Sequence, residues 1–290
     1  MKLIAIDLDG TLLNTHHKIS KENADAIRMA QRLGIEVTIC TGRYYADVKA
    51  LADEAGIKTH IISNNGSSIC SKDGQTIDSF QLNRVDLKEI LTWLEKNSYS
   101  YEIATDFNNI YLKDAFENLE KDFYTAKKID SSLEESALHT VLGALRSQTN
   151  MMLLDSKEDI LSLTDNLYNL QVVTFDKEKR KKGIEFCKSN GSFSVVTSSD
   201  FNFELVNNIT SKGHALSVLG KYLNIGLTET MAIGDSFNDL SMLKKAKYSV
   251  AMGNAREEIK SICDFTTLKN NDNGVAHAIN KYISKCNISI

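Results

Sequence analysis

The stretch IAIDLDGTLLN, residues 4–14, joins an apolar run to two aspartates. Residues 2–7 have the nearly continuous apolar character of a strand that is covered on both faces of a sheet. Asp7 and Asp9 stand where this strand ends. Two like charges so close together repel each other and resist removal from water. The pair therefore either needs a compensating cation or is only a polar turn after the strand.

Strand and helix patterns alternate through the first part of the chain. A helix is predicted from Ser20 to about Leu33, with the serine as its cap. An apolar strand follows at residues 35–40, then a helix at residues 45–55. A further short strand leads into an Asn-Gly turn at residues 64–66. This order predicts an α/β fold with a doubly wound parallel (Rossmann-like) sheet.

The middle of the chain has a different pattern from its two ends. Residues 207–290 repeat the strand-helix alternation, whereas residues 83–206 suggest helices combined with antiparallel hairpins. We therefore expect residues 1–82 and 207–290 to form one catalytic core, with an α+β cap domain inserted between them. The basic run at 177–183 within this insert is most simply explained as a solvated helix face, and the alternative is a patch that contacts a substrate or partner.

The composition limits the class of protein. With 42% hydrophobic and 25% charged residues, the 290-residue chain resembles a soluble globular protein. A net charge of -4 gives no reason to expect binding to nucleic acid or to an acidic membrane. No apolar run approaches the roughly 18 residues that are needed to span a bilayer. Five scattered cysteines without a CxxC pair disfavour zinc and disulfides, and they favour a reducing cytoplasm.

Polar residues follow four of the predicted core strands. They are Asp7 with Asp9, Thr41 with Gly42 and Arg43, Asn64 with Asn65 and Gly66, and Asp235. Because ligands of an open parallel sheet bind beyond the carboxyl ends of its strands, these groups should meet, with Lys212 near them at the start of a helix. Three carboxylates suit Mg²⁺, whose charge would offset their repulsion. Lys212 and the Thr41 hydroxyl suit a phosphate group.

A carboxylate that faces phosphorus beside Mg²⁺ can act as a nucleophile. Asp7 could then form an aspartyl-phosphate, and Asp9 could protonate the leaving oxygen and later deprotonate water. Each feature alone has a simpler explanation, such as a polar turn, a surface position for Lys212 or a helix cap at Asp235. Their joint occurrence in this order, three of them at strand ends, favours the catalytic interpretation.

The segments DLDGT (7–11), TGR (41–43) and GDSFNDLSML (234–243), together with Lys212, resemble the four ordered motifs of haloacid-dehalogenase-type (HAD) phosphatases. The insert between the second motif and Lys212 resembles the cap of the Cof-type branch of that superfamily. VAMGNA and NNDNGVAHAI are also similar to downstream stretches of this branch. The resemblance covers both ends of the chain well, and it covers the insert only in position and rough pattern.

The resemblance implies a role for each matched residue. Asp7 would be the nucleophile and a Mg²⁺ ligand, and Asp9 the general acid/base whose main-chain carbonyl also binds the metal. Asp235 would be the third protein ligand, and Asp239 would support the metal through water. The phosphoryl group would be held or oriented by Thr41, Gly42, Lys212 and Asn238.

The leading hypothesis is a Mg²⁺-dependent phosphatase for small phosphorylated metabolites, such as a sugar phosphate, a nucleotide or a cofactor phosphate. The alternatives are a phosphotransferase or phosphomutase that uses the same aspartyl-phosphate, and a non-catalytic sensor of phosphorylated metabolites. Among weaker candidates, Asn65 is more simply explained by its turn, and Asn270 would steady the site. We expect a cytoplasmic monomer or homodimer.

Overall fold

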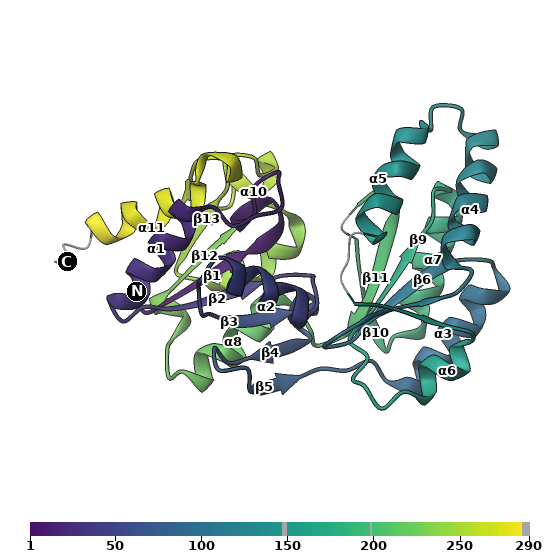
Figure 1. Ribbon diagram of the computed structural model, residues 1–290, viewed down its shortest axis with the longest axis horizontal. Coiled ribbons are helices and arrows are strands. Elements are labelled where there is room, and N and C mark those ends of the chain that lie inside the picture. The colour runs from purple at the N-terminus through teal and green to yellow at the C-terminus, as the bar shows by residue number, and fades with distance from the viewer. Residues whose placement is uncertain (147–149, 198, 286–290) are drawn as a thin grey trace. The chain divides into compact units, whose positions relative to one another are not determined.

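The computed structural model describes residues 1–146, 150–197 and 199–285 (Figure 1). The chain divides into two compact units. We call Met1–Ser79 with Thr210–Ile290 the core unit, and Phe80–Ile209 the inserted unit. The inserted unit begins three residues before the expected start and ends three residues after the expected end.

The core unit is built on an eight-stranded sheet with the strand order β14-β13-β12-β1-β2-β3-β4-β5. Its strands are β1 (Leu3–Asp7), β2 (Glu36–Cys40), β3 (His60–Ser63), β4 (Ser68–Cys70), β5 (Thr76–Ser79), β12 (Thr230–Gly234), β13 (Tyr248–Ala251) and β14 (Phe265–Thr266). The strands from β14 to β3 are parallel, which confirms the predicted doubly wound α/β class. Every residue of β1 and β12 is buried, as expected for central strands with both faces covered.

One edge of this sheet adds antiparallel strands that the sequence pattern did not predict. β4 runs antiparallel to β3, and β5 antiparallel to β4. The connection from β3 to β4 is the turn Asn64–Gly66 with Ser67. A turn this short can only reverse the chain, because a parallel neighbour needs a crossover of a dozen residues or more.

The helices of the core unit are α1 (Lys21–Arg32), α2 (Tyr45–Glu54), α8 (Lys212–Tyr222), α9 (Leu240–Lys245), α10 (Glu257–Lys260) and α11 (Gly274–Lys285). α1 begins as predicted, because the Ser20 hydroxyl accepts the backbone N–H of Asn23 at 3.2 Å. α1 packs beside α11, and the two lie side by side in Figure 1. The buried Asn23 amide accepts the Ala276 N–H at 3.0 Å and donates to the Leu12 carbonyl at 3.4 Å. It thereby joins α11 to the segment after β1.

The inserted unit has a six-stranded sheet with the order β10-β11-β9-β6-β7-β8. Its strands are β6 (Ser100–Ala104), β7 (Asn109–Leu112), β8 (Met151–Leu154), β9 (Asn169–Val173), β10 (Phe193–Val196) and β11 (Asn202–Asn207). Its helices are α3 (Arg84–Lys96), α4 (Ala115–Ile129), α5 (Glu135–Arg146), α6 (Lys157–Ser162) and α7 (Lys177–Asn190). The predicted hairpins β6–β7 and β10–β11 are confirmed, and only β7–β8 is parallel among the described pairs. No helix in the described part of the chain is long and apolar enough to cross a bilayer.

One face of this second sheet carries a hydrophobic cluster of the inserted unit. Ile103, Leu170 and Leu205 come from adjacent strands and are completely buried. They belong to one cluster with Leu91 of α3 and Cys187 of α7. Side chains alternate between the faces of a strand, so the residues next to these positions point to the opposite face.

The basic run 177–183 is more than the solvated helix face that we expected. It forms the start of α7, where Lys179 Nζ lies 2.6 Å from Asp122 Oδ1. Arg180 Nε donates to the Asn202 carbonyl at 2.9 Å. Lys179 thus contacts α4, and Arg180 contacts β11. Part of the run therefore stabilises the inserted unit itself.

Candidate active site

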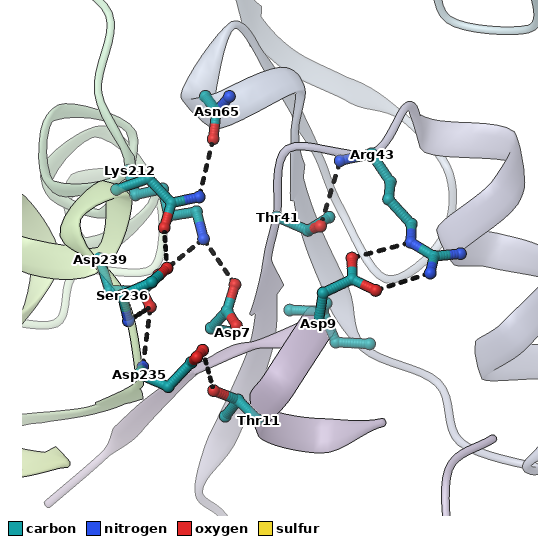
Figure 2. A network of polar contacts seen from close by, with 12 residues as sticks. Asp7, Asp9, Thr11, Thr41, Arg43, Asn65, Lys212, Asp235, Ser236 and Asp239 are labelled. Carbon is teal, nitrogen blue, oxygen red and sulfur yellow. Dashed lines mark hydrogen bonds and ion pairs between the residues drawn. The ribbon is translucent and has the colours of Figure 1, made fainter. Parts of the chain in front are cut away.

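The predicted site residues of the core unit come together at the carboxyl ends of its central strands (Figure 2). β1 pairs in parallel with β2 on one side and with β12 on the other. Parallel neighbours end at the same edge of a sheet, so Asp7 of β1 lies near Thr41 after β2 and Asp235 after β12. Lys212, the first residue of α8, reaches the same place and contacts Asp7.

Asp7, Asp235 and Asp239 form an acidic cluster. One carboxylate oxygen from each lies within 4.8 Å of the others. Burial, and then the charge of Asp239, raise the pKa of Asp7 well above its usual range. The same two causes raise the pKa of Asp235 to about 6. The protein alone thus opposes negative charge here, and a divalent cation would reverse this; an all-oxygen donor set fits Mg²⁺.

Asp239 shapes the loop that carries this cluster. Its side chain is completely buried. Its Oδ2 accepts the backbone N–H groups of Asp235 at 2.9 Å and Ser236 at 3.1 Å, and its Oδ1 accepts from Lys212 Nζ at 2.6 Å. A Cβ at Gly234 would lie 2.6 Å from Asp239 Oδ2, so this close approach requires glycine. Both oxygens of Asp239 are therefore occupied, which fits a supporting role beside the metal ligands.

Lys212 is a completely buried cation between two carboxylates. Its Nζ lies 2.6 Å from Asp7 Oδ1 and 2.6 Å from Asp239 Oδ1. Burial opposes its charge, but the carboxylates of Asp239 and Asp7 outweigh this effect and raise the pKa of Lys212 above its ordinary value. The ammonium group is therefore charged at neutral pH. It lies beside the Asp7 oxygens, where an incoming phosphoryl group would gain a positive neighbour.

Asp9 points away from the acidic cluster and toward Arg43 (Figure 2). Arg43 Nε donates to Asp9 Oδ2 at 2.8 Å, and Arg43 Nη2 donates to Asp9 Oδ1 at 2.6 Å. The Asp9 side chain is 51% exposed, so it remains accessible. Its carboxylate is therefore not part of the cluster that could hold a cation. This agrees with the expectation that Asp9 would bind the metal through its main-chain carbonyl.

Thr41 and Gly42 lie against the turn that joins β3 to β4. The buried Thr41 carbonyl accepts the Asn65 N–H at 2.9 Å. A Cβ at Gly42 would lie 3.3 Å from the Asn65 side-chain amide, so glycine gives this amide room. Asn238 Nδ2 donates to Asn65 Oδ1 at 3.3 Å, and Ser236 Oγ donates to Asn238 Oδ1 at 2.6 Å. These contacts link the loops after β2, β3 and β12.

The loop after β1 is held close to Asp235. Gly10 has a φ of 78°, and a Cβ there would lie 2.7 Å from Asp235 Oδ2. The Thr11 hydroxyl donates to Asp235 Oδ1 at 3.1 Å. Further along the loop, Asn270 Nδ2 donates to the Leu13 carbonyl at 2.9 Å. Asn270 therefore braces this loop, as its resemblance implied.

The structure brings most of the predicted residues into one network, and it shows partners of Asn65 and Arg43 that sequence reasoning did not identify. Asn65 was attributed mainly to a turn, yet its side chain also contacts Asn238. Arg43 was noted only as part of TGR, and it binds both oxygens of Asp9. The signal for Arg43 was its position directly after the strand next to Asp9. Nothing in the sequence indicated which side chain it would meet.

Comparison with known proteins defines the class. The family model for haloacid dehalogenase-like hydrolases matches residues 4–279. The chain belongs to this family. This confirms that it is a hydrolase of the haloacid dehalogenase-like class, as its motifs predicted. A solved haloacid dehalogenase-like hydrolase from B. subtilis has a TM-score of 0.83 and 40% sequence identity, covering 97% of this chain and 99% of that one.

Curated relatives within this family are named phosphatases. The chain is 41% identical over 279 residues to the phosphatase YwpJ of Bacillus subtilis (strain 168), which covers 96% of this chain and 98% of that protein. It is 34% identical over 284 residues to YwtE of the same organism, covering 98% of this chain and 99% of that protein. YwtE is named a 5-amino-6-(5-phospho-D-ribitylamino)uracil phosphatase.

Proposed function

We propose that this chain is a Mg²⁺-dependent phosphatase that hydrolyses small phosphorylated metabolites through an aspartyl-phosphate on Asp7. The observation that carries the proposal is the position of Asp7, buried at the end of β1 and in contact with the buried Lys212 ammonium at 2.6 Å. Burial opposes the negative charge of Asp7. A cation beside this carboxylate, or a covalent bond from its oxygen to phosphorus, would reduce that charge.

In the first step, a carboxylate oxygen of Asp7 attacks phosphorus, and the bond from phosphorus to the leaving oxygen breaks. Asp9 gives its proton to that oxygen, so the leaving group departs as an alcohol. Lys212 balances part of the negative charge on the phosphoryl oxygens. Thr41 and Asn238 both hydrogen-bond to Asn65, and from there they would orient those oxygens.

In the second step, Asp9 takes a proton from water while the water oxygen attacks phosphorus. The bond between phosphorus and Asp7 breaks, and inorganic phosphate leaves. The same group thus serves as acid and then as base, which a carboxylate with 51% exposed side chain can do because water reaches it. A Mg²⁺ ion held by Asp7, Asp235 and the Asp9 carbonyl would offset the charge of the carboxylates and of the phosphoryl oxygens.

The substrate class follows from the relatives by analogy. YwtE is named for a phosphorylated ribitylamino compound, and another relative is named HMP-PP phosphatase. We propose substrates of this size, with the inserted unit as a cap that reads the leaving group. We also propose a cytoplasmic location, because five scattered cysteines without a CxxC pair suit a reducing compartment.

The test is phosphate release from an aryl phosphate and from a panel of metabolite phosphates. We expect turnover with Mg²⁺, loss of turnover with a chelator, and recovery when Mg²⁺ is added again. Full activity in a metal-free preparation would contradict the metal assignment. Absence of phosphate release from every substrate, with the protein folded and Mg²⁺ present, would contradict the phosphatase assignment.

A further inference from the structure

Arg43 connects Asp9 to a second carboxylate on helix α2. Its Nε and Nη2 bind the two oxygens of Asp9 at 2.8 Å and 2.6 Å. Its third nitrogen, Nη1, donates to Asp47 Oδ2 at 2.8 Å. One guanidinium group therefore bridges the loop after β1 and the first turn of α2. A fork that binds both oxygens of a carboxylate fixes its direction as well as its distance.

The bridge becomes more buried toward Asp47. The side chain of Asp9 is 51% exposed, that of Arg43 is 28% exposed and that of Asp47 is 16% exposed. Asp47 is thus the inner anchor of the bridge. It lies in the first turn of α2, where the helix N-terminus favours negative charge. The position of the Asp47 carboxylate is therefore set by the backbone of α2.

The backbone of Arg43 is fixed as well. Its N–H donates to the Thr41 hydroxyl at 3.1 Å, and its carbonyl accepts the Asn64 N–H at 2.9 Å. The side chain is thus held at its root by the loops after β2 and β3, and at its tip by Asp47. The guanidinium group therefore presents its other two N–H donors to Asp9 in one orientation.

Orientation matters for Asp9, because a general acid must stand within hydrogen-bond reach of the leaving oxygen. A half-exposed aspartate that is not held in place can rotate freely. The ion pair with Arg43 removes that freedom without burying the carboxylate. The precision of the pair depends in turn on where Asp47 holds the guanidinium group.

We propose that Asp47 is a positioning residue for Asp9 and that it acts through Arg43. The inference rests on the proposed role of Asp9 as general acid and base. It adds a residue outside the four motifs to the machinery for proton transfer. The competing explanation is that Arg43 and Asp47, four residues apart in sequence, only stabilise the start of α2 as an ordinary ion pair.

The first test is Asp47→Asn, which keeps the size and one oxygen acceptor but removes the charge that anchors Arg43. A misplaced general acid harms poor leaving groups most, because good ones depart with little protonation. We therefore expect kcat with an alkyl phosphate to fall by about 3- to 10-fold and kcat with an aryl phosphate to fall less. Arg43→Lys keeps the charge but loses the fork, so the same imbalance should be larger.

The matched control is Asp53→Asn on the same helix. Asp53 forms an exposed ion pair with Lys49, also four residues apart, and neither residue touches Asp9 or Arg43. This variant should change neither kcat value. Equal losses with alkyl and aryl phosphates in Asp47→Asn, or the same losses in Asp53→Asn, would show a general effect of α2 and overturn the proposal.

The second test combines Asp47→Asn with Asp9→Asn. If Asp47 acts only through Asp9, the double variant should have the turnover of Asp9→Asn alone. Additive losses would overturn the proposal while leaving the phosphatase function intact. If Asp9→Asn itself turned over metabolite phosphates at the parent rate, the proposed function of Asp9 would be wrong, and that outcome is distinct from additivity.

Discussion

The core unit and the inserted unit both bury carboxylates, but with different partners. In the core unit, Asp7 and Asp239 share the buried Lys212 ammonium. In the inserted unit, Glu102 of β6 and Glu204 of β11 are 7% and 5% exposed. The Tyr111 hydroxyl donates to Glu102, and Asn169 Nδ2 donates to Glu204 Oε2 at 2.9 Å.

Strand pairing explains the second arrangement. Glu102, Gln171 and Glu204 stand opposite one another on β6, β9 and β11, on the face opposite to that of Ile103, Leu170 and Leu205. Tyr111 on β7 extends the same row. Gln171 also accepts from Asn202 Nδ2 at 3.4 Å. A hydroxyl and an amide thus donate to the carboxylates of the inserted unit, whereas Asp7 and Asp239 of the core unit pair with a cation.

The kind of partner determines what each group of carboxylates can do. A buried cation between carboxylates sets up a charge balance that a metal and a phosphoryl group can change, which suits chemistry. Amides and hydroxyls satisfy a carboxylate by hydrogen bonds and fix its direction, which suits shape and recognition. Changes to the buried carboxylates of the core unit should therefore alter turnover by orders of magnitude, and changes to those of the inserted unit by much less.

Asp7→Asn should have the largest effect. It removes the nucleophile and a charged metal ligand together, so turnover should fall by at least about 10⁴-fold. The metal-free protein should lose no stability, because burial and the neighbouring carboxylates oppose the charge of Asp7. Phosphate release and urea unfolding in the presence of a chelator measure the two effects. A strong loss of stability would show that Asp7 supports the fold rather than the chemistry.

Lys212→Met should be the most damaging change for stability. It leaves Asp7 and Asp239 buried without their shared cation, and breaking a buried pair in this way costs about 3–5 kcal/mol. Urea unfolding at neutral pH measures this, with Lys244→Met on the exposed side of α9 as the control. If both variants unfold at the same urea concentration, the buried ion pairs contribute nothing to stability.

Glu204→Gln tests the inserted unit. Glutamine keeps an oxygen that can accept from Asn169 Nδ2, so the free energy of unfolding should change by about 1 kcal/mol or less. Turnover of an aryl phosphate should stay at the parent value, because Glu204 belongs to the inserted unit and the acidic cluster to the core unit. A large loss of aryl phosphatase activity would break the comparison, because the row on this sheet would then take part in the chemistry.

His60 offers a third kind of buried group, and the smallest effect. Its Nδ1 accepts the Lys72 N–H at 3.2 Å, and its Nε2 lies 3.2 Å from Glu36 Oε2. Burial is the main cause that lowers the pKa of His60 in the folded state. Its contribution to stability is therefore complete above the unfolded pKa of about 6.5 and is lost as the pH falls below that value.

The expected result is that the parent protein loses more stability between about pH 7.5 and about pH 5.5 than His60→Gln, which lacks this titration. Urea unfolding at the two pH values measures the difference. Equal losses in both proteins would contradict the direction of the His60 pKa shift. Phosphatase activity at neutral pH should be unchanged, because His60 begins β3 at the end away from the site.

Much of the core unit could be predicted from the sequence because its signals are local. The apolar residues 3–6 of β1 indicate a strand with both faces covered, and Asp7 at its end marks the ligand-binding edge of a parallel sheet. Asp239 was also placed correctly near the cluster. Its bonds to the backbone N–H groups of Asp235 and Ser236 were not foreseen, because they depend on the shape of the loop.

The inserted unit was predicted less completely because its features depend on contacts between distant segments. Glu102 and Glu204 are ordinary polar positions in the sequence, and only the register through β9 places them in one row. Register in a sheet is set by packing and turn geometry and not by the residues of one strand alone. The bridge from Asp9 through Arg43 to Asp47 was missed for the same reason, since it joins the loop after β1 to α2 through the loop after β2.

In the proposed mechanism, Asp7 receives the phosphoryl group and Asp9 moves the protons. Rapid mixing of Asp9→Asn with an aryl phosphate tests it most directly. An aryl leaving group needs little protonation, so Asp7 should still be phosphorylated while hydrolysis slows by about 10²- to 10⁴-fold. We predict a burst of aryl alcohol close to one equivalent per enzyme, followed by slow turnover. Linear release without a burst, at the rate of the parent enzyme, would contradict the account.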